Sequence, residues 1–238
     1  MNNIEIDYFG SILKIEVKRI SSARKYTLRI HNGLRRAVLT MPVKGSIQTA
    51  FELAKKNAGW IHSRINHIPD AIPFIPHAEI WFKGQPHTLI HHQDKKGATW
   101  VEFIASDCKG FIHVNGDLPH FERRLKEFLR KAAFVELKSA VSSYCDLLHI
   151  PTPQLSLRDT KSRWGSCSAD GSLSFSWRLI MAPEFVLNYL AAHEVCHLIH
   201  LNHSPDFWKL TRSLCPMTDE AELWLKKKGI ELYKFGAA

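Results

Sequence analysis

The strongest chemical signal in the sequence is the segment His193–His197, which reads HEVCH. It belongs to an apolar stretch with helical periodicity that begins near Pro183. On a helix, residues four apart share one face and lie about 6 Å apart along the axis, so both imidazoles can bind one Zn²⁺. The pattern predicts a zinc site at His193 and His197, in which Glu194 is the general base that takes a proton from zinc-bound water.

A catalytic zinc needs a third protein ligand. The candidates downstream are His200, His203, Asp206, Glu220 and Glu222. A continuing helix would turn His200 away from His193 and would carry His203 about 15 Å along the axis. His203 can therefore share the metal only if the helix ends and the chain turns back. Asn202 tolerates a left-handed turn, and Ser204-Pro205-Asp206 has the residues of a helix start, which favours such a reversal.

The rest of the chain predicts the elements that position this segment. Alternating apolar residues indicate strands near 4–8, 12–18, 26–30, 36–41, 78–83, 87–92, 99–104, 110–114, 154–158 and 172–177. Helical periodicity covers about 46–66 and, after Leu118-Pro119, a long stretch to about His149. We therefore expect an α+β fold, with a β-rich N-terminal region over 1–118 and an α+β catalytic domain with the HExxH helix over 119–238.

Composition restricts the class of protein. The chain has 238 residues, of which 45% are hydrophobic and 23% charged, as in ordinary globular proteins. No apolar run approaches the ~18 residues that span a membrane, and the first residues do not resemble a secretory signal. The five cysteines include no CxxC pair and are expected to be reduced thiols. These features predict a cytoplasmic protein without a membrane partner.

Positive charge is concentrated near the N-terminus. The net charge is +9, and residues 1–60 hold 11 lysines and arginines against 4 acidic residues. Several of these basic side chains are expected to share a sheet face or edge: Arg19, Arg24, Lys25, Arg29, Arg35 and Arg36. Such a surface favours nucleic acid or another polyanion as a partner, and a solvated basic face without a fixed partner is the alternative.

Several motifs together resemble one family, the YgjP-like metal-dependent hydrolases of bacteria and archaea, which are classed as zincin-type metallopeptidases. They are Lys161–Cys167 (KSRWGSC), Gly171–Ile180, Ala182-Pro183, the HExxH segment and Asn202–Trp208 (NHSPDFW). The family is more distantly similar to SprT-like proteases, which act on proteins bound or crosslinked to DNA. The resemblance spans most of the chain and implies a zincin-like catalytic domain with one zinc per chain on His193, His197 and His203, and a catalytic Glu194.

Two interpretations of the RWGSC segment stay open. It could form a strand edge that pairs with an extended peptide, with Arg163 stabilising an oxyanion at the metal. Alternatively, Arg163 and Trp164 could simply hold the strand against the zinc helix.

The sequence favours a zinc metallopeptidase acting on a peptide or protein substrate. A second hypothesis is a metal-dependent hydrolase of a non-peptide substrate such as a nucleotide phosphoanhydride, although the sequence has no P-loop and no set of paired carboxylates for two metals. A third is a protease recruited by DNA. A non-enzymatic nucleic-acid-binding module would explain the charge but would leave Glu194 without a role.

Overall fold

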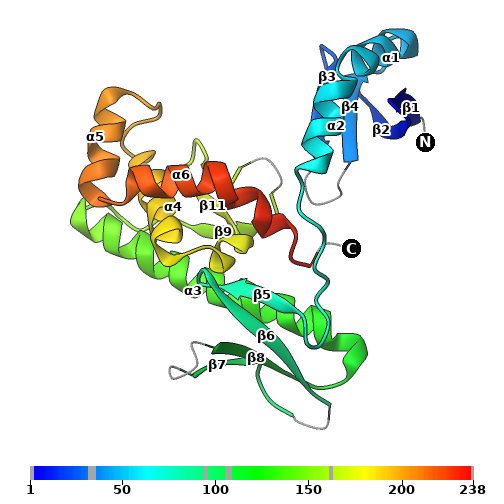
Figure 1. Cartoon of the computed structure of the whole chain (residues 1–238). Coiled ribbons are helices and arrows are strands. Elements are labelled where there is room, and N and C mark those ends of the chain that lie inside the picture. The colour runs from blue at the N-terminus through cyan, green and yellow to red at the C-terminus, as the bar shows by residue number, and fades with distance from the viewer. Residues whose placement is uncertain (1–2, 32–35, 94–95, 105–108, 161–162, 237–238) are drawn as a thin grey trace. The chain divides into compact units, whose positions relative to one another are not determined.

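The computed structural model describes residues 3–31, 36–93, 96–104, 109–160 and 163–236 (Figure 1). Its strands and helices confirm the predicted α+β class. By internal contacts the chain divides into two units, one reaching to Asp70 and the other over Ala71–Gly236. Within the described ranges, no helix combines the length and the apolar composition needed to cross a bilayer.

The first unit is a four-stranded sheet that shares a core with two helices. Its elements are β1 (Asn3–Tyr8), β2 (Ser11–Ile20), β3 (Thr27–His31), β4 (Arg36–Pro42), α1 (Ile47–Lys56) and α2 (Ala58–Asn66). The strand order is β1-β2-β4-β3, with β2 and β4 parallel and the outer pairs antiparallel. Because side chains alternate along a strand, one face supplies the apolar residues of this core. Its buried members are Ile4, Ile6, Leu13, Ile15, Ala37, Leu39, Met41, Ala50, Ala54, Ala58 and Ile61.

The helix predicted over 46–66 is interrupted at Asn57, which separates α1 from α2. The backbone of Asn57 has φ −103° and ψ 12°, and its side-chain amide donates to the carbonyl of Leu53 at 2.7 Å. A hydrogen bond from a side chain to a backbone carbonyl competes with the backbone hydrogen bonds of the helix. This competition explains why the predicted helix is divided into α1 and α2.

The second unit begins with a sheet of the same topology as the first. Its strands are β5 (Glu79–Phe82), β6 (Gln85–His92), β7 (Trp100–Ile104) and β8 (Lys109–Asn115), in the order β5-β6-β8-β7 with β6 and β8 parallel. The first hairpin of each sheet closes through a two-residue turn in which both φ angles are positive, Phe9-Gly10 and Lys83-Gly84.

The β5–β6 turn also fixes the segment that leads into the HExxH helix. The amides of Lys83 and Gly84 donate to the carbonyls of Ile180 and Met181, at 2.7 and 3.2 Å. Both acceptors belong to the 3₁₀ turn η4 (Trp177–Met181). A Cβ at Gly84 would lie 2.8 Å from Pro183, so the close approach requires glycine here.

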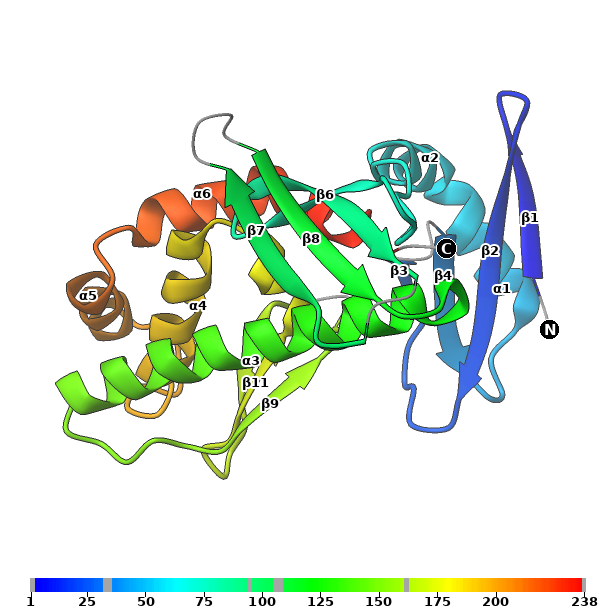
Figure 2. The same ribbon diagram turned by 90° about the horizontal axis from the view of Figure 1, so that it is seen from below.

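The long helix α3 (Phe121–Leu147) organises the core of the second unit. It follows the 3₁₀ turn η3 (Leu118–His120) and packs against β8, β9, η4 and α4 (Figure 2). A buried stripe repeats every four residues along it: Phe121, Leu125, Leu129, Ala133, Leu137, Val141 and Cys145. The expected change of character at residue 118 is therefore the start of this helix and lies inside the second unit.

A small sheet and three helices complete the second unit. The sheet contains β9 (Leu155–Arg158), β10 (Gly165–Cys167) and β11 (Leu173–Ser176) in the order β10-β11-β9, so β10 is an edge strand. The helices are α4 (Glu184–Cys196), α5 (Pro205–Leu214) and α6 (Thr218–Lys228), followed by the 3₁₀ turn η5 (Gly229–Tyr233). Strand β10 packs against α4, which carries the HExxH segment.

Candidate metal centre

Helix α4 ends before His203, as is necessary if the chain is to turn back and bring His203 near His193. The last helical residue is Cys196, whose carbonyl accepts from the amide of His200 at 2.9 Å. The chain then turns, and α5 starts with Ser204 as its N-cap, accepting from the amide of Phe207 at 3.3 Å. This reversal carries His203 back towards the end of α4.

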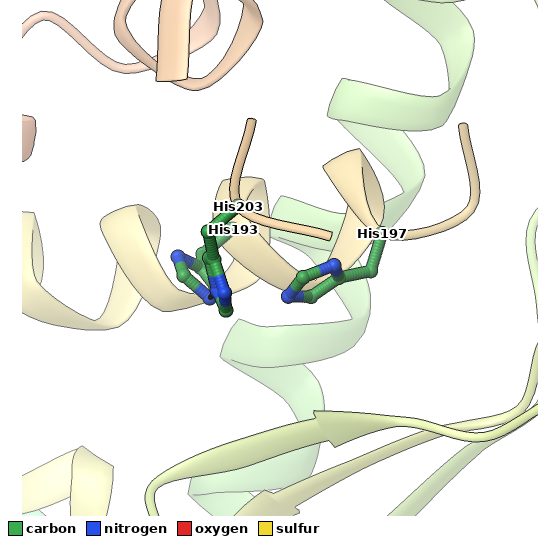
Figure 3. A group of neighbouring side chains, drawn as sticks. All are labelled: His193, His197 and His203. Atoms are coloured by element: carbon green, nitrogen blue, oxygen red, sulfur yellow. Dashed lines mark hydrogen bonds between the residues drawn. The ribbon is translucent and has the colours of Figure 1, made fainter. Parts of the chain in front are cut away.

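The three histidines predicted as ligands lie together at this reversal (Figure 3). One ring nitrogen from each of His193, His197 and His203 can be chosen so that all lie within 4.8 Å of one another. The Nε2 atoms of His193 and His203 are 3.1 Å apart. Two nitrogen ligands on a tetrahedral zinc are about 3.3 Å apart, so the spacing suits a shared metal ion.

Hydrogen bonds orient two of the imidazoles. His197 Nδ1 lies 3.0 Å from the carbonyl oxygen of His200 and must donate to it. Nε2 is then the unprotonated nitrogen, whose lone pair can bind a metal. His193 Nδ1 lies 3.3 Å from the Tyr189 hydroxyl, which in turn donates to Glu222 Oε1 at 3.4 Å. Burial and the nearby Glu222 raise the pKa of Tyr189, so its hydroxyl stays protonated and available as this donor.

Aromatic side chains pack around the three imidazoles. The buried ring of Phe207 has its centroid 4.9, 4.6 and 4.7 Å from those of His193, His197 and His203. Trp208 stacks on His203 at 5.6 Å. Sequence reasoning used these aromatics only as part of a resemblance, although their position in the first turns of α5 could have indicated packing against His203.

The environment favours the neutral form of two of the imidazoles, His193 and His197. Burial, followed by the charges of His197 and His203, lowers the pKa of His193 to about 3. Burial also lowers the pKa of His197. A metal ligand must be unprotonated, so this environment keeps the lone pairs available.

Glu194 is buried beside the three histidines. It is 4% exposed, and its Oε2 atom has no hydrogen-bond partner among the described residues. Burial raises its pKa to about 7, while the charge of Arg163 and the backbone amide of Cys167 oppose that rise. An orphaned carboxylate oxygen next to three converging nitrogen atoms fits a site that holds a metal and a reacting molecule.

These groups line one open cleft of about 390 Å³ between β10 and α4. Its walls are Arg163, Gly165, Ser166, Cys167, Ser168, Ala169, His193, Glu194, His197, Leu201 and His203. Three imidazole nitrogen donors with room for a further ligand are the donor set of a catalytic zinc site. The residues present therefore fit the expected metal.

Two of the other residues considered as a third ligand, Glu222 and His200, support the histidines through hydrogen bonds. Glu222 accepts from Tyr189, and His200 contributes its backbone carbonyl to His197. No other cluster of three histidine, cysteine or carboxylate side chains able to hold a metal occurs within the described ranges.

The basic residues of the first unit are divided between surfaces. By strand register, Arg29 and Arg36 share the open face of the sheet with Lys14 and Lys18. Glu16 pairs with both Lys18 and Arg36. Arg19 instead donates to the carbonyls of Val43 and Gly45, and Arg35 lies outside the described residues. Part of the predicted basic face is thus neutralised.

A family model described as YgjP-like, metallopeptidase domain, matches residues 24–228. The chain belongs to this family. It is therefore a metallopeptidase, a hydrolase of peptide bonds that works with a metal, as the sequence motifs predicted. The match covers most of the chain and includes the larger part of the first unit.

Two solved structures are similar to part of this YgjP-like chain. One is the metallopeptidase zymogen of Pyrococcus abyssi abylysin, 20% identical, covering 39% of this chain and 95% of that one, with a TM-score of 0.36. The other is the metallopeptidase zymogen of Methanocaldococcus jannaschii jannalysin, 23% identical, with the same coverage and a TM-score of 0.34. Among curated proteins, none matches the sequence.

Proposed function

We propose that the chain is a zinc peptidase in which His193, His197 and His203 hold one Zn²⁺ per chain and Glu194 is the general base. The observation that carries the proposal is the convergence of three ring nitrogen atoms beside a buried carboxylate with a free oxygen. Neutral imidazoles favour zinc over magnesium or calcium, which prefer oxygen ligands.

The chemistry divides between the metal and Glu194. When bound, zinc supplies a Lewis acid that polarises the substrate carbonyl and lowers the pKa of water. Glu194 accepts a proton from the attacking water and then passes it to the nitrogen of the leaving amine as the C–N bond breaks. Its buried position and its raised pKa suit a group that must both take and return a proton near neutral pH.

The edge strand β10 supports an extended peptide as the substrate. One side of β10 pairs with β11, no other described strand pairs with its second side, and the residues of β10 line the cleft. A peptide can add to such an edge through main-chain hydrogen bonds, which would draw the scissile bond past Glu194. Recruitment by nucleic acid through the first unit stays a separate prediction.

The test is hydrolysis of a mixed peptide library by zinc-loaded protein, analysed by mass spectrometry, with nucleoside triphosphates assayed in parallel. We expect peptide cleavage that a chelator abolishes and zinc restores. The matched control is Glu194→Gln, which is nearly isosteric and should keep zinc while losing at least about 10²-fold in rate, because an amide cannot accept the proton. Cleavage of triphosphates alone, or full activity of Glu194→Gln, would contradict the proposal.

A further inference from the structure

Arg163 brings a positive charge to the metal cleft. Its side chain is exposed and lines the same cleft as Glu194 and the three histidines. Among the described residues, its guanidinium makes no ion pair with a carboxylate, although its charge acts on the nearby Glu194. Because the guanidinium is exposed, water can satisfy its five N–H donors, and a molecule that enters the cleft can replace that water. The head group of Arg163 is therefore accessible to a molecule in the cleft.

Hydrogen bonds hold the backbone carbonyls of Arg163 and Trp164. The carbonyl of Arg163 accepts from Thr160 Oγ1 at 2.6 Å, and the carbonyl of Thr160 accepts from the Tyr233 hydroxyl at 2.9 Å. On the other side, the carbonyl of Trp164 accepts from the amide of Ser176 at 2.8 Å. The Trp164 ring also packs against Tyr233, with centroids 5.0 Å apart.

Tyr233 belongs to η5, and a buried arginine holds the end of that turn. Arg178 is 6% exposed and donates to the carbonyls of Leu232 and Phe235 at 3.0 and 2.7 Å. It also pairs with Asp159 at 2.8 Å, just before Thr160. Arg178 and Tyr233 thus contact Asp159, Thr160 and Trp164, and Thr160 in turn donates to the backbone carbonyl of Arg163.

We propose that Arg163 is a substrate-contacting catalytic residue, whose guanidinium donates to the scissile carbonyl oxygen as that oxygen becomes negative, and that Tyr233 is the residue that positions it. The inference rests on the proposed peptidase function. A guanidinium stays charged at every working pH, and a donor held in place before the reaction needs no reorganisation during it. The role requires an accessible head group on a backbone held by hydrogen bonds, which is the arrangement at Arg163.

The first test compares Arg163→Met with Arg158→Met in zinc-loaded protein. Arg158 is exposed on β9, the other edge of the same sheet, and provides the control for loss of one arginine. Removing one donor to an oxyanion lowers kcat by roughly 10²–10³-fold. We expect that loss for Arg163→Met only, with KM within about threefold because the neutral carbonyl of the ground state gains little from the guanidinium.

Binding of a phosphinic peptide, an anionic tetrahedral group on a peptide frame, distinguishes contact with substrate from an effect on Glu194. For Arg163→Met we expect its Kd to rise by about the same factor as kcat falls, measured by calorimetry at unchanged zinc content. A loss of kcat with unchanged phosphinic-peptide affinity would mean that Arg163 acts on Glu194 alone and would overturn the inference. So would a change under about threefold in both quantities.

The second test concerns Tyr233. Tyr233→Phe removes only the hydroxyl that holds Thr160, and Tyr26→Phe is its matched control, because Tyr26 also donates to a backbone carbonyl, that of Ser46 at 3.1 Å. We expect kcat to fall about tenfold for Tyr233→Phe alone, at constant KM and zinc content. In the Arg163→Met background, Tyr233→Phe should have no further effect on kcat. Additive losses would refute a positioning role.

Failure of the proposed function and failure of the Arg163 role give different results. Zinc content and Glu194→Gln report on the proposed function without any variant of Arg163. If the wild-type protein cleaves no peptide, the phosphinic peptide still decides: binding that Arg163→Met weakens supports an anion-binding Arg163, and absence of binding to zinc-loaded wild-type protein refutes it.

Discussion

Gly165 and Glu194 are in contact between β10 and α4, and the carboxylate of Glu194 occupies the space that a Cβ at residue 165 would need. Glu194 Oε1 and the side-chain carbons behind it would all clash with a methyl group there. The backbone of the edge strand therefore passes close to Glu194, and this packing contributes to the low exposure of the Glu194 side chain.

This contact predicts the effect of Gly165→Ala. The methyl group of the alanine is attached to the backbone of β10 and cannot move away, so the Glu194 side chain would be displaced. Hydrolysis should then fall at least about 10²-fold while zinc stays bound. Gly229→Ala is the control, since a Cβ there would meet its nearest atom at an ordinary 3.4 Å. Peptide turnover and metal analysis of both variants test the prediction, and an active Gly165→Ala protein would contradict it.

His203→Ala should lower zinc content sharply, because it removes one of three nitrogen donors that converge at the site. His200→Ala should keep zinc, since His197 bonds to the backbone carbonyl of His200, which the substitution retains. Metal analysis of both proteins, purified without chelator, measures the difference. A full zinc content in His203→Ala would show that another residue is the third ligand.

Tyr189→Phe should weaken zinc binding without removing a ligand. The hydroxyl of Tyr189 links His193 to Glu222, and loss of such a supporting bond typically costs about 10–100-fold in metal affinity. Glu222→Gln keeps an oxygen acceptor for Tyr189 and should have a smaller effect. Competition with a chromophoric chelator gives both affinities, and an unchanged value for Tyr189→Phe would exclude this role.

Arg178→Met should destabilise the second unit. The substitution leaves the carbonyls of Leu232 and Phe235 without their buried donor, which should cost at least about 2 kcal/mol of unfolding free energy. Arg212→Met removes an exposed ion pair with Asp219, which solvent screens, and should change stability much less. Urea unfolding of both variants, followed by near-UV circular dichroism, tests the contrast, which equal effects would refute.

Polyanion binding by the first unit can be tested with single-stranded DNA. If the open sheet face binds it, log K should fall linearly with log salt, by roughly 0.7 for each phosphate neutralised. Arg29→Gln should weaken binding, whereas Lys226→Gln on α6 and Glu194→Gln should not, because they lie in the other unit. No binding at low salt would remove nucleic acid from the partners of this protein.

The sequence alone determined the features that depend on residues close together in the chain. Four-residue spacing put His193 and His197 on one helical face, and the cap at Ser204 started a new helix after a turn. The motifs also indicated the family, which the family model confirms. These signals are local because periodicity and capping depend on neighbouring residues only.

Only the tertiary structure decided which distant segments meet at the cleft. Three such contacts join residues whose proximity no sequence pattern indicates. They are the contact of Gly165 with Glu194, the hydrogen bond from Tyr233 to Thr160, and the hydrogen bond from Arg178 to the carbonyl of Phe235. The same is true of the two sheets with one topology, since strand periodicity does not specify which strands pair. Such contacts depend on how α3 and the small sheet pack around one core, and that packing is a property of the whole unit.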